Sequence, residues 1–172
     1  DNSLEDEEFD AITSIECLSH IADRDRFFRE VVRTLKPNGR IAMSAWLQGS
    51  RATSPFVQRW LESVNRGARF ASIANSSELQ SLLAKYDFEL TAWEEAGASV
   101  KRTWRILVVR LAWRCLTRRV YRQFFWTSFR GERFLPLTVL QTWIAFELGV
   151  LQYVIFAARK PEKEAPISPQ PR

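Results

Sequence analysis

The chain has 172 residues, which is room for one domain of ordinary size. It is 46% hydrophobic and 26% charged, so its composition is that of a globular protein and excludes a wholly disordered chain. Two cysteines are too few for a disulfide framework or a cysteine-based metal cluster, so we expect a reduced, cytoplasmic setting and no metal site.

The formal net charge of +5 is unevenly distributed. The first ten residues carry acids and no base, whereas residues 101–133 are rich in lysine and arginine, with Glu132 as the single acid. Basic charge among aromatic rings suits nucleic acid, an anionic membrane surface or an acidic partner. Because no nucleic-acid reading motif is present, we expect no nucleic-acid partner. Peripheral membrane contact through the basic and aromatic residues 101–130 remains an alternative.

In chain order, the first predicted element is a buried strand at Phe9–Ile15, which follows a polar surface loop. Asp23 is suited to cap a helix that runs to about Leu35, with one apolar face. The Pro37-Asn38-Gly39 sequence is typical of a turn and ends that helix. Arg40–Trp46 then predicts a second strand, apolar enough to be covered on both faces.

The next elements continue the alternation of strand and helix. Pro55 to about Val64 predicts a short helix, Ser76 or Ser77 is suited to cap a helix at Glu78–Lys85, and Phe88–Glu94 predicts a strand. Such alternation favours a parallel α/β sheet.

The later part of the chain changes in character. In the helical segment Val100–Phe129 four arginines recur every fourth residue and predict a basic stripe on one face, at positions 110, 114, 118 and 122. This face is either a solvated edge or an interfacial surface that lies on a membrane. The apolar run Phe134–Ala158 is long enough for a transmembrane helix to be considered. A helix to Leu148, a stop at Gly149 and a strand at 151–158 fit the sequence better. The tail from Pro161 is rich in proline and charge, and we expect it to be disordered.

Ligands of an open α/β sheet bind beyond the carboxyl ends of its strands. The loop after Phe9–Ile15 therefore holds the candidate site, and it contains the only histidine, His20, close to an acid, Glu16. An imidazole exchanges protons near neutral pH and can act as a general base. The alternative is a structural histidine that bonds a backbone carbonyl.

Four segments resemble class I S-adenosylmethionine-dependent methyltransferases, and together they extend to about residue 161. They are FDAITSIECLSHI, FFREVVRTLKPNGRIAMSAW, SSELQSLLAKYDFEL and LQYVIFAARKP. The helices before the last segment resemble the tocopherol O-methyltransferase and sterol methyltransferase-like branch. The resemblance implies a partial Rossmann-like α/β sheet made of strands four to seven, with the last strand antiparallel and an inserted helical cap. It divides the chain into a core at 1–99, a cap or lid at 100–149, a closing strand at 150–160 and a tail at 161–172.

The resemblance further implies S-adenosylmethionine as the cofactor, with Ser14, Ile15 and Glu16 beside it. It also implies methyl transfer to a hydrophobic or amphipathic small molecule, such as a phenol or quinol, a sterol-like compound or an amine. The first three strands and the glycine-rich cofactor loop of the family have no counterpart in this sequence, so we expect a fragment of the enzyme. The alternative is a non-catalytic binding or membrane-surface module derived from the same fold.

For the chemistry, the resemblance assigns His20 and Glu16 as catalytic residues, and His20 and Trp46 as substrate-binding residues. Related enzymes carry a glutamate directly before this histidine, where Ser19 stands here. Glu16, one helical turn earlier, is the acid that could substitute for it. Trp46 is either a wall of the acceptor pocket or ordinary core.

Overall fold

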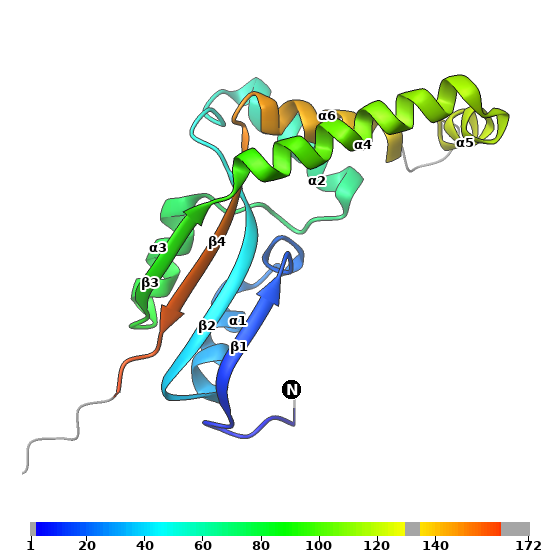
Figure 1. Cartoon of the computed structure of the whole chain (residues 1–172). Coiled ribbons are helices and arrows are strands. Elements are labelled where there is room, and N and C mark those ends of the chain that lie inside the picture. The colour runs from blue at the N-terminus through cyan, green and yellow to red at the C-terminus, as the bar shows by residue number, and fades with distance from the viewer. Residues whose placement is uncertain (1–2, 130–134, 163–172) are drawn as a thin grey trace, which may run out of the picture.

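A computed structural model describes residues 3–129 and 135–162. A mixed sheet carries helices on one face and at one end (Figure 1). The elements in chain order are β1 (Phe9–Ile15), the 3-10 turn η1 (Leu18–His20), α1 (Arg24–Thr34), β2 (Leu35–Gln48), α2 (Pro55–Ala68), α3 (Ser76–Lys85), β3 (Glu89–Glu95), α4 (Gly97–Thr117), α5 (Arg119–Phe129), α6 (Leu135–Glu147) and β4 (Leu151–Arg159).

The described strands form one sheet in the order β1-β2-β4-β3. β1 pairs with β2 in parallel, and β4 lies between β2 and β3, antiparallel to both. The last strand is thus inserted between two earlier ones, after the helices α4, α5 and α6. The predicted α/β class, with an antiparallel last strand and helices inserted before it, is confirmed.

The main core lies between the sheet and the helices α1 and α3. Asp23 caps α1, since its Oδ1 accepts from the Arg26 backbone N–H at 2.9 Å, as predicted. Phe28 of α1 is fully buried and meets Phe88 edge-on at 6.5 Å between ring centroids. The alternate residues of β2 that begin with Ile41 face the same core.

The prediction that Phe9–Ile15 is a buried strand is wrong. β1 forms one edge of the described sheet, and most of its residues are exposed; Ile15 is 76% exposed. The opposite face of β2 is also open in part, since Ala42 is exposed. The face toward α1 and α3 is covered, and Ile12 packs there. The opposite face is covered near Trp46 and Tyr153, which pack against Trp104 and Phe146.

Two predicted boundaries are also corrected. Pro37-Asn38-Gly39 does not separate the helix from the strand, because β2 already begins at Leu35 and contains these residues. Asn38 adopts a left-handed φ of 62°, and the register with β1 shifts between Phe9 and Ala11, so the expected turn is a bulge within the strand. The cap of α3 is Asn75, which accepts from the Glu78 N–H at 2.8 Å, and not a serine.

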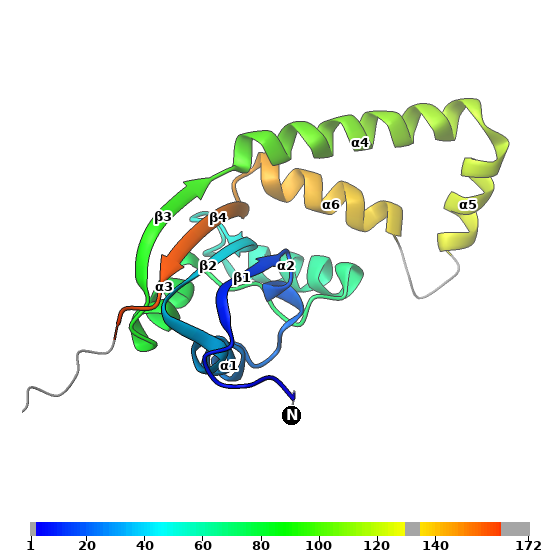
Figure 2. The same cartoon turned by 60° about the horizontal axis from the view of Figure 1, so that its bottom comes forward.

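The predicted arginine stripe is interrupted. Arg118 is extended, with φ −124° and ψ 119°, and divides the segment into α4 and α5. Arg122 turns back and donates to the Leu116 carbonyl at 2.9 Å. A spacing of four residues keeps side chains on one face only within a continuous helix, so this break removes the shared face. α4 and α5 extend away from the sheet (Figure 2).

The apolar run divides as predicted. α6 ends at Glu147, Gly149 has a left-handed φ of 70°, and β4 begins at Leu151. In the described ranges, no helix is long and apolar enough to cross a membrane. Gly49, just after β2, lies directly against this turn and its N–H donates to the Val150 carbonyl at 2.8 Å. The predicted disordered tail falls mostly outside the described residues.

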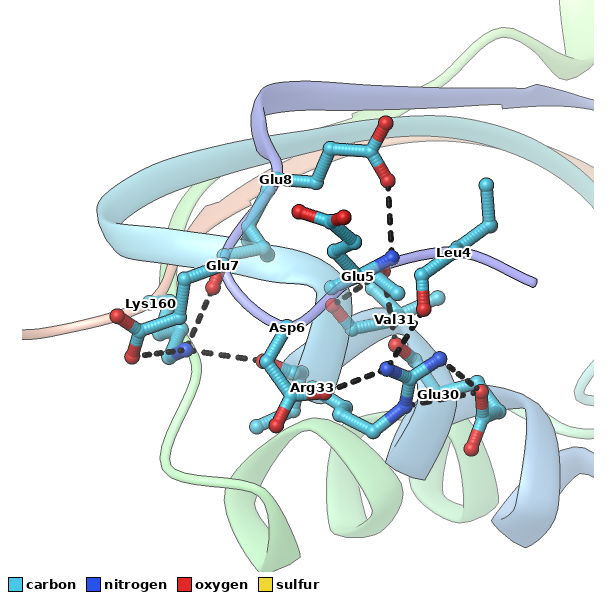
Figure 3. Close-up of polar contacts among 12 residues, drawn as sticks. Leu4, Glu5, Asp6, Glu7, Glu8, Glu30, Val31, Arg33 and Lys160 are labelled. Atoms are coloured by element: carbon cyan, nitrogen blue, oxygen red, sulfur yellow. Dashed lines mark hydrogen bonds and ion pairs between the residues drawn. The ribbon is translucent and has the colours of Figure 1, made fainter. Parts of the chain in front are cut away.

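The acidic N-terminal segment is tied down by two basic residues (Figure 3). Arg33 of α1 binds the Leu4 carbonyl at 3.0 Å and the Asp6 carboxylate at 2.5 Å. Lys160, which follows β4 and is buried, lies 3.9 Å from the Glu7 carboxylate. It also donates to the Leu35 carbonyl at 2.6 Å and to the Val32 carbonyl at 2.9 Å. These carbonyls end α1, so Lys160 satisfies groups that the helix itself leaves free.

Candidate functional site

The candidate site lies where β1 and β2 end side by side. Ile15 pairs with Ser44 in register, and the Glu16 N–H extends the ladder by donating to the Ser44 carbonyl at 3.0 Å. Glu16 then adopts a left-handed φ of 56°, which costs energy in a residue other than glycine and turns the chain away from the sheet. The three residues predicted to lie beside the cofactor, Ser14, Ile15 and Glu16, therefore form the tip of β1.

The turn η1 carries His20 at its last position, where the side chain is exposed. Its Nδ1 lies 3.2 Å from the carbonyl oxygen of Arg69, and its ring meets Phe70 edge-on at 5.0 Å. A carbonyl oxygen only accepts, so this hydrogen bond requires the proton on Nδ1. The Nε2 of the neutral ring then carries a free lone pair. The contact thus fixes the tautomer of the neutral imidazole and leaves Nε2 as the ring nitrogen able to accept a proton.

Trp46, near the end of β2, lies in a cluster of aromatic rings. It meets Phe70 at 5.2 Å, Phe146 of α6 at 5.3 Å and Trp104 of α4 at 5.8 Å, each close to edge-on. Phe70 thus stands between His20 and Trp46. The two predicted substrate-binding residues belong to one continuous aromatic wall at the carboxyl end of the sheet, beneath α4 and α6.

The structure gives Glu16 a different neighbour from the expected one. In the described part of the chain, no hydrogen bond or ion pair joins Glu16 to His20. The Glu16 carboxylate instead lies near the phenol of Tyr153 and influences its pKa. Tyr153 belongs to β4, where it pairs with Trp46 of β2. Burial raises the pKa of Tyr153, the Ser44 hydroxyl opposes this, and Glu16 raises it further. The phenol therefore stays protonated at neutral pH.

Sequence reasoning missed Phe70 and Tyr153. Phe70 lies in the loop between α2 and α3, and Tyr153 reads as an ordinary strand residue. Only the antiparallel register of β2 and β4 reveals that Tyr153 faces Trp46. The phenolic hydroxyl within an otherwise apolar strand was the one signal available.

Two cavities of the described structure lie away from this rim. One of about 360 Å³ is lined by residues of the N-terminal segment, β1 and α1, and one of about 410 Å³ lies between α4 and α5. Among the residues that the structure describes, no group of His, Cys, Asp and Glu is arranged to hold a metal ion.

Comparison with known proteins agrees with this fold. The methyltransferase domain family matches residues 1–43, within which Glu16 and His20 lie. The fold is that of class I S-adenosylmethionine-dependent methyltransferases, and the predicted resemblance to this class is confirmed.

Among individual relatives, chloroplastic tocopherol O-methyltransferase of Arabidopsis thaliana is 25% identical over 170 residues, which cover 94% of this chain and 46% of that protein. Geranyl diphosphate C-methyltransferase of Streptomyces coelicolor A3(2), solved with Mg²⁺, geranyl diphosphate and S-adenosyl-L-homocysteine, has a TM-score of 0.69 at 17% identity. This likeness covers 93% of this chain and 50% of that one. A Galdieria sulphuraria protein, provisionally assigned as a sarcosine dimethylglycine methyltransferase, has a TM-score of 0.75 at 16% identity, over 92% and 56% of the two chains. The chain spans about half the length of these relatives.

Proposed function

We propose that this chain is the acceptor-side part of an S-adenosylmethionine-dependent methyltransferase that acts on a hydrophobic or amphipathic small molecule. The observation that carries the proposal is the setting of His20. Its ring is fixed by the Arg69 carbonyl and by Phe70, at the strand end where ligands of open α/β sheets bind.

In this proposal His20 removes the proton of the acceptor. Its Nε2 accepts that proton while the Arg69 carbonyl keeps the other ring nitrogen protonated. General base catalysis of this kind contributes roughly 10²–10⁴-fold to a rate. Alignment of acceptor and donor contributes more, about 7–11 kcal/mol, and requires walls that exclude water. The cluster of Trp46, Phe70, Trp104 and Phe146 supplies such a wall.

The tip of β1 fits one side of the cofactor. S-adenosylmethionine supplies a methyl group already activated by its sulfonium. Ile15 offers an exposed apolar side chain at the strand tip, and Glu16 turns the backbone away there. Ser14, Ile15 and Glu16 would hold the cofactor from this side. The six glycines of the sequence are widely separated, so we propose that a glycine-rich cofactor loop has to be supplied by residues outside this sequence.

The acceptor is proposed to be hydrophobic because the wall around Trp46 is aromatic. Two relatives are named for tocopherol and geranyl diphosphate, both of which carry isoprenoid chains. A phenol or quinol, a sterol-like compound and an amine are the acceptor classes to compare.

The base role is tested with His20→Asn. The asparagine amide can still donate to the Arg69 carbonyl, but it lacks the lone pair of Nε2. In a protein that contains this chain and transfers labelled methyl groups, we expect kcat to fall about 10²–10⁴-fold, with cofactor affinity unchanged. His20→Phe keeps only the ring contact with Phe70, and its kcat should fall at least as far. Retention of activity by either variant would overturn the role of His20.

The fragment proposal has a separate test. Isothermal titration of this chain with S-adenosylmethionine should show no binding in the micromolar range. Micromolar affinity of the chain alone would contradict the need for a further cofactor loop, while leaving the role of His20 open to the test above.

The second candidate function is a membrane-surface module, and it rests on α4 and α5. α4 has no buried residue, and Trp113, Leu116 and Trp126 are exposed among lysines and arginines. We propose a cytoplasmic protein that makes peripheral contact with anionic lipid through residues 101–130. Co-sedimentation with vesicles of phosphatidylcholine, with and without phosphatidylglycerol, tests it. Binding that requires the anionic lipid and is lost in Trp113→Ser with Trp126→Ser supports the module, and unaltered or absent binding rejects it.

A further inference from the structure

A small internal cavity lies directly behind the candidate site. It measures about 10 Å³ and is lined by Leu18, Ser19, Arg24, Trp46, Leu47, Ala74 and Leu79. The lining joins the turn η1, the start of α1, the end of β2 and α3. Four of these residues are apolar, and the other three bring polar groups into an otherwise apolar interior.

Each of the three polar residues has a buried atom that lacks a hydrogen-bond partner among the described residues. These atoms are Ser19 Oγ, Arg24 Nε and Trp46 Nε1. Ser19 is 3% exposed and Arg24 is 9% exposed. Buried polar groups are almost always paired in folded proteins, and the three residues that carry these atoms line the same cavity, which points to one common partner.

Arg24 has one hydrogen-bond donor without an acceptor among the described residues. Its Nη1 donates to the Glu78 carboxylate at 2.8 Å, and its Nη2 donates to Ser72 at the carbonyl oxygen and at Oγ, at 2.6 and 2.7 Å. Both terminal nitrogens of the guanidinium are therefore engaged on one side. Nε is the guanidinium nitrogen whose N–H has no acceptor among the described residues.

We propose that one water molecule is bound in this cavity and bridges Ser19, Arg24 and Trp46. The guanidinium Nε–H and the indole N–H both donate, and a water oxygen has two lone pairs to accept them. One O–H of the same water can donate to Ser19 Oγ. A single water needs roughly 10–15 Å³ and typically makes about three hydrogen bonds, which matches the size and the polar groups found here.

Other occupants fit less well. A cation would meet the positive guanidinium and the indole N–H, neither of which offers a lone pair, and a polyatomic anion is too large for about 10 Å³. Water is the small ligand that can both accept and donate.

This water would connect the two halves of the candidate site through the interior. Ser19 precedes His20, and its carbonyl accepts from the Ala71 N–H at 2.8 Å, which ties η1 to the loop that carries Phe70. The water extends that tie to Trp46 on β2. The inference rests on the cavity and its polar atoms, and it stands whether or not the chain transfers methyl groups.

A high-resolution crystal structure of the chain, or of a longer protein that contains it, is the direct test. We expect one ordered water at about 2.7–3.2 Å from each of Ser19 Oγ, Arg24 Nε and Trp46 Nε1. A clear map with no water in this cavity, or with these three atoms bonded to protein groups, would overturn the proposal.

Two serine variants provide a matched test in solution. Ser19 and Ser44 both have a buried hydroxyl, but the Ser44 hydroxyl neighbours the Tyr153 phenol and only Ser19 lines the cavity. The Trp46 indole proton, assigned with Trp46→Phe, should show magnetic cross-relaxation with a long-lived water. Ser19→Ala should weaken this signal and lower the folding equilibrium constant roughly three- to tenfold. Ser44→Ala should leave the signal unchanged. No signal in the parent protein, or equal loss in both variants, contradicts the proposal.

Discussion

The sheet with its two covering helices and the arm formed by α4 and α5 use hydrophobic residues differently. In the first region Phe28, Leu35 and Ile41 are fully buried, and the apolar residues of α1, β2 and β4 share one cluster. In the arm Trp113 is 66% exposed, and α4 contains no buried residue. Large exposed apolar surfaces mark interaction sites. The arm beyond Trp104, which packs against Trp46, therefore contributes little to the stability of this chain, and its exposed apolar residues are available for contacts beyond it.

The largest expected effect compares one aromatic residue from each region. Phe28→Ala should reduce the free energy of unfolding by about 3–5 kcal/mol, because it removes a fully buried ring from a packed core. Trp113→Ala, a larger truncation, should change it by no more than about 0.5 kcal/mol. Urea unfolding of both variants measures the difference. A comparable loss in the two would show that the arm is part of the stabilising core.

Glycine substitutions sharpen the same comparison. A Cβ at Gly49 would lie 2.1 Å from the Gly149 carbonyl oxygen, whereas a Cβ at Gly97 would have nothing within 4 Å. Gly49→Ala should therefore cost roughly 1–3 kcal/mol through forced backbone movement. Gly97→Ala, at the first position of α4, should stabilise by about 0.4–1 kcal/mol. The midpoint of thermal unfolding should fall in Gly49→Ala and rise in Gly97→Ala. A shift of the same sign in both variants would contradict the close contact after β2.

Two lysines should differ in their contribution to stability because one is buried and the other is partly exposed. Lys160 is buried and donates to two carbonyls at the end of α1, while Lys36 is half-exposed and pairs with exposed Asp10. Lys160→Met leaves those carbonyls without their donor and should cost about 1–3 kcal/mol. Lys36→Met should cost no more than about 1 kcal/mol, as is usual for a surface ion pair. Chemical denaturation distinguishes them, and equal costs would rule out a capping role for Lys160.

The sequence was sufficient to predict much of the first region because local signals act there. The carboxylate of Asp23 caps the helix that follows it. The sequences before and after Gly149 differ in their preference for helix and strand, which separates α6 from β4. The exposure of Ile15 could not be predicted, since an apolar strand has the same pattern whether or not a covering layer lies over it. The break at Arg118 was also hidden, because regular arginine spacing assumes a helix that continues.

The candidate site was predictable only in part for the same physical reason. Glu16 and His20 follow one strand in sequence, so their place beyond its carboxyl end follows from local order. Tyr153 and Phe70 reach the same rim through strand pairing and a distant loop, which no local pattern encodes. The assigned roles of Ser14, Ile15, Glu16, His20 and Trp46 stay predictions.

The smallest expected effect concerns the ion pair that joins the arm to α6. Arg105 Nη2 donates to Glu147 Oε1 at 2.7 Å, and the pKa of Glu147 is lowered mainly by this hydrogen bond, with burial opposing it and the Trp143 N–H adding to it. A carboxyl group whose pKa is lower in the folded state stabilises the fold above its unfolded pKa, and this stabilisation is lost as the pH falls through the folded value. Arg105→Gln should therefore destabilise the chain slightly at pH 7 and not at all in strong acid. Arg102→Gln, on the same helix, is the matched control and should show no such pH dependence. Unfolding curves from pH 7 to pH 3 measure both variants. If the effect of Arg105→Gln is the same at both ends of that range, the pair does not hold the base of the arm, and α4 is fixed by its aromatic contacts alone.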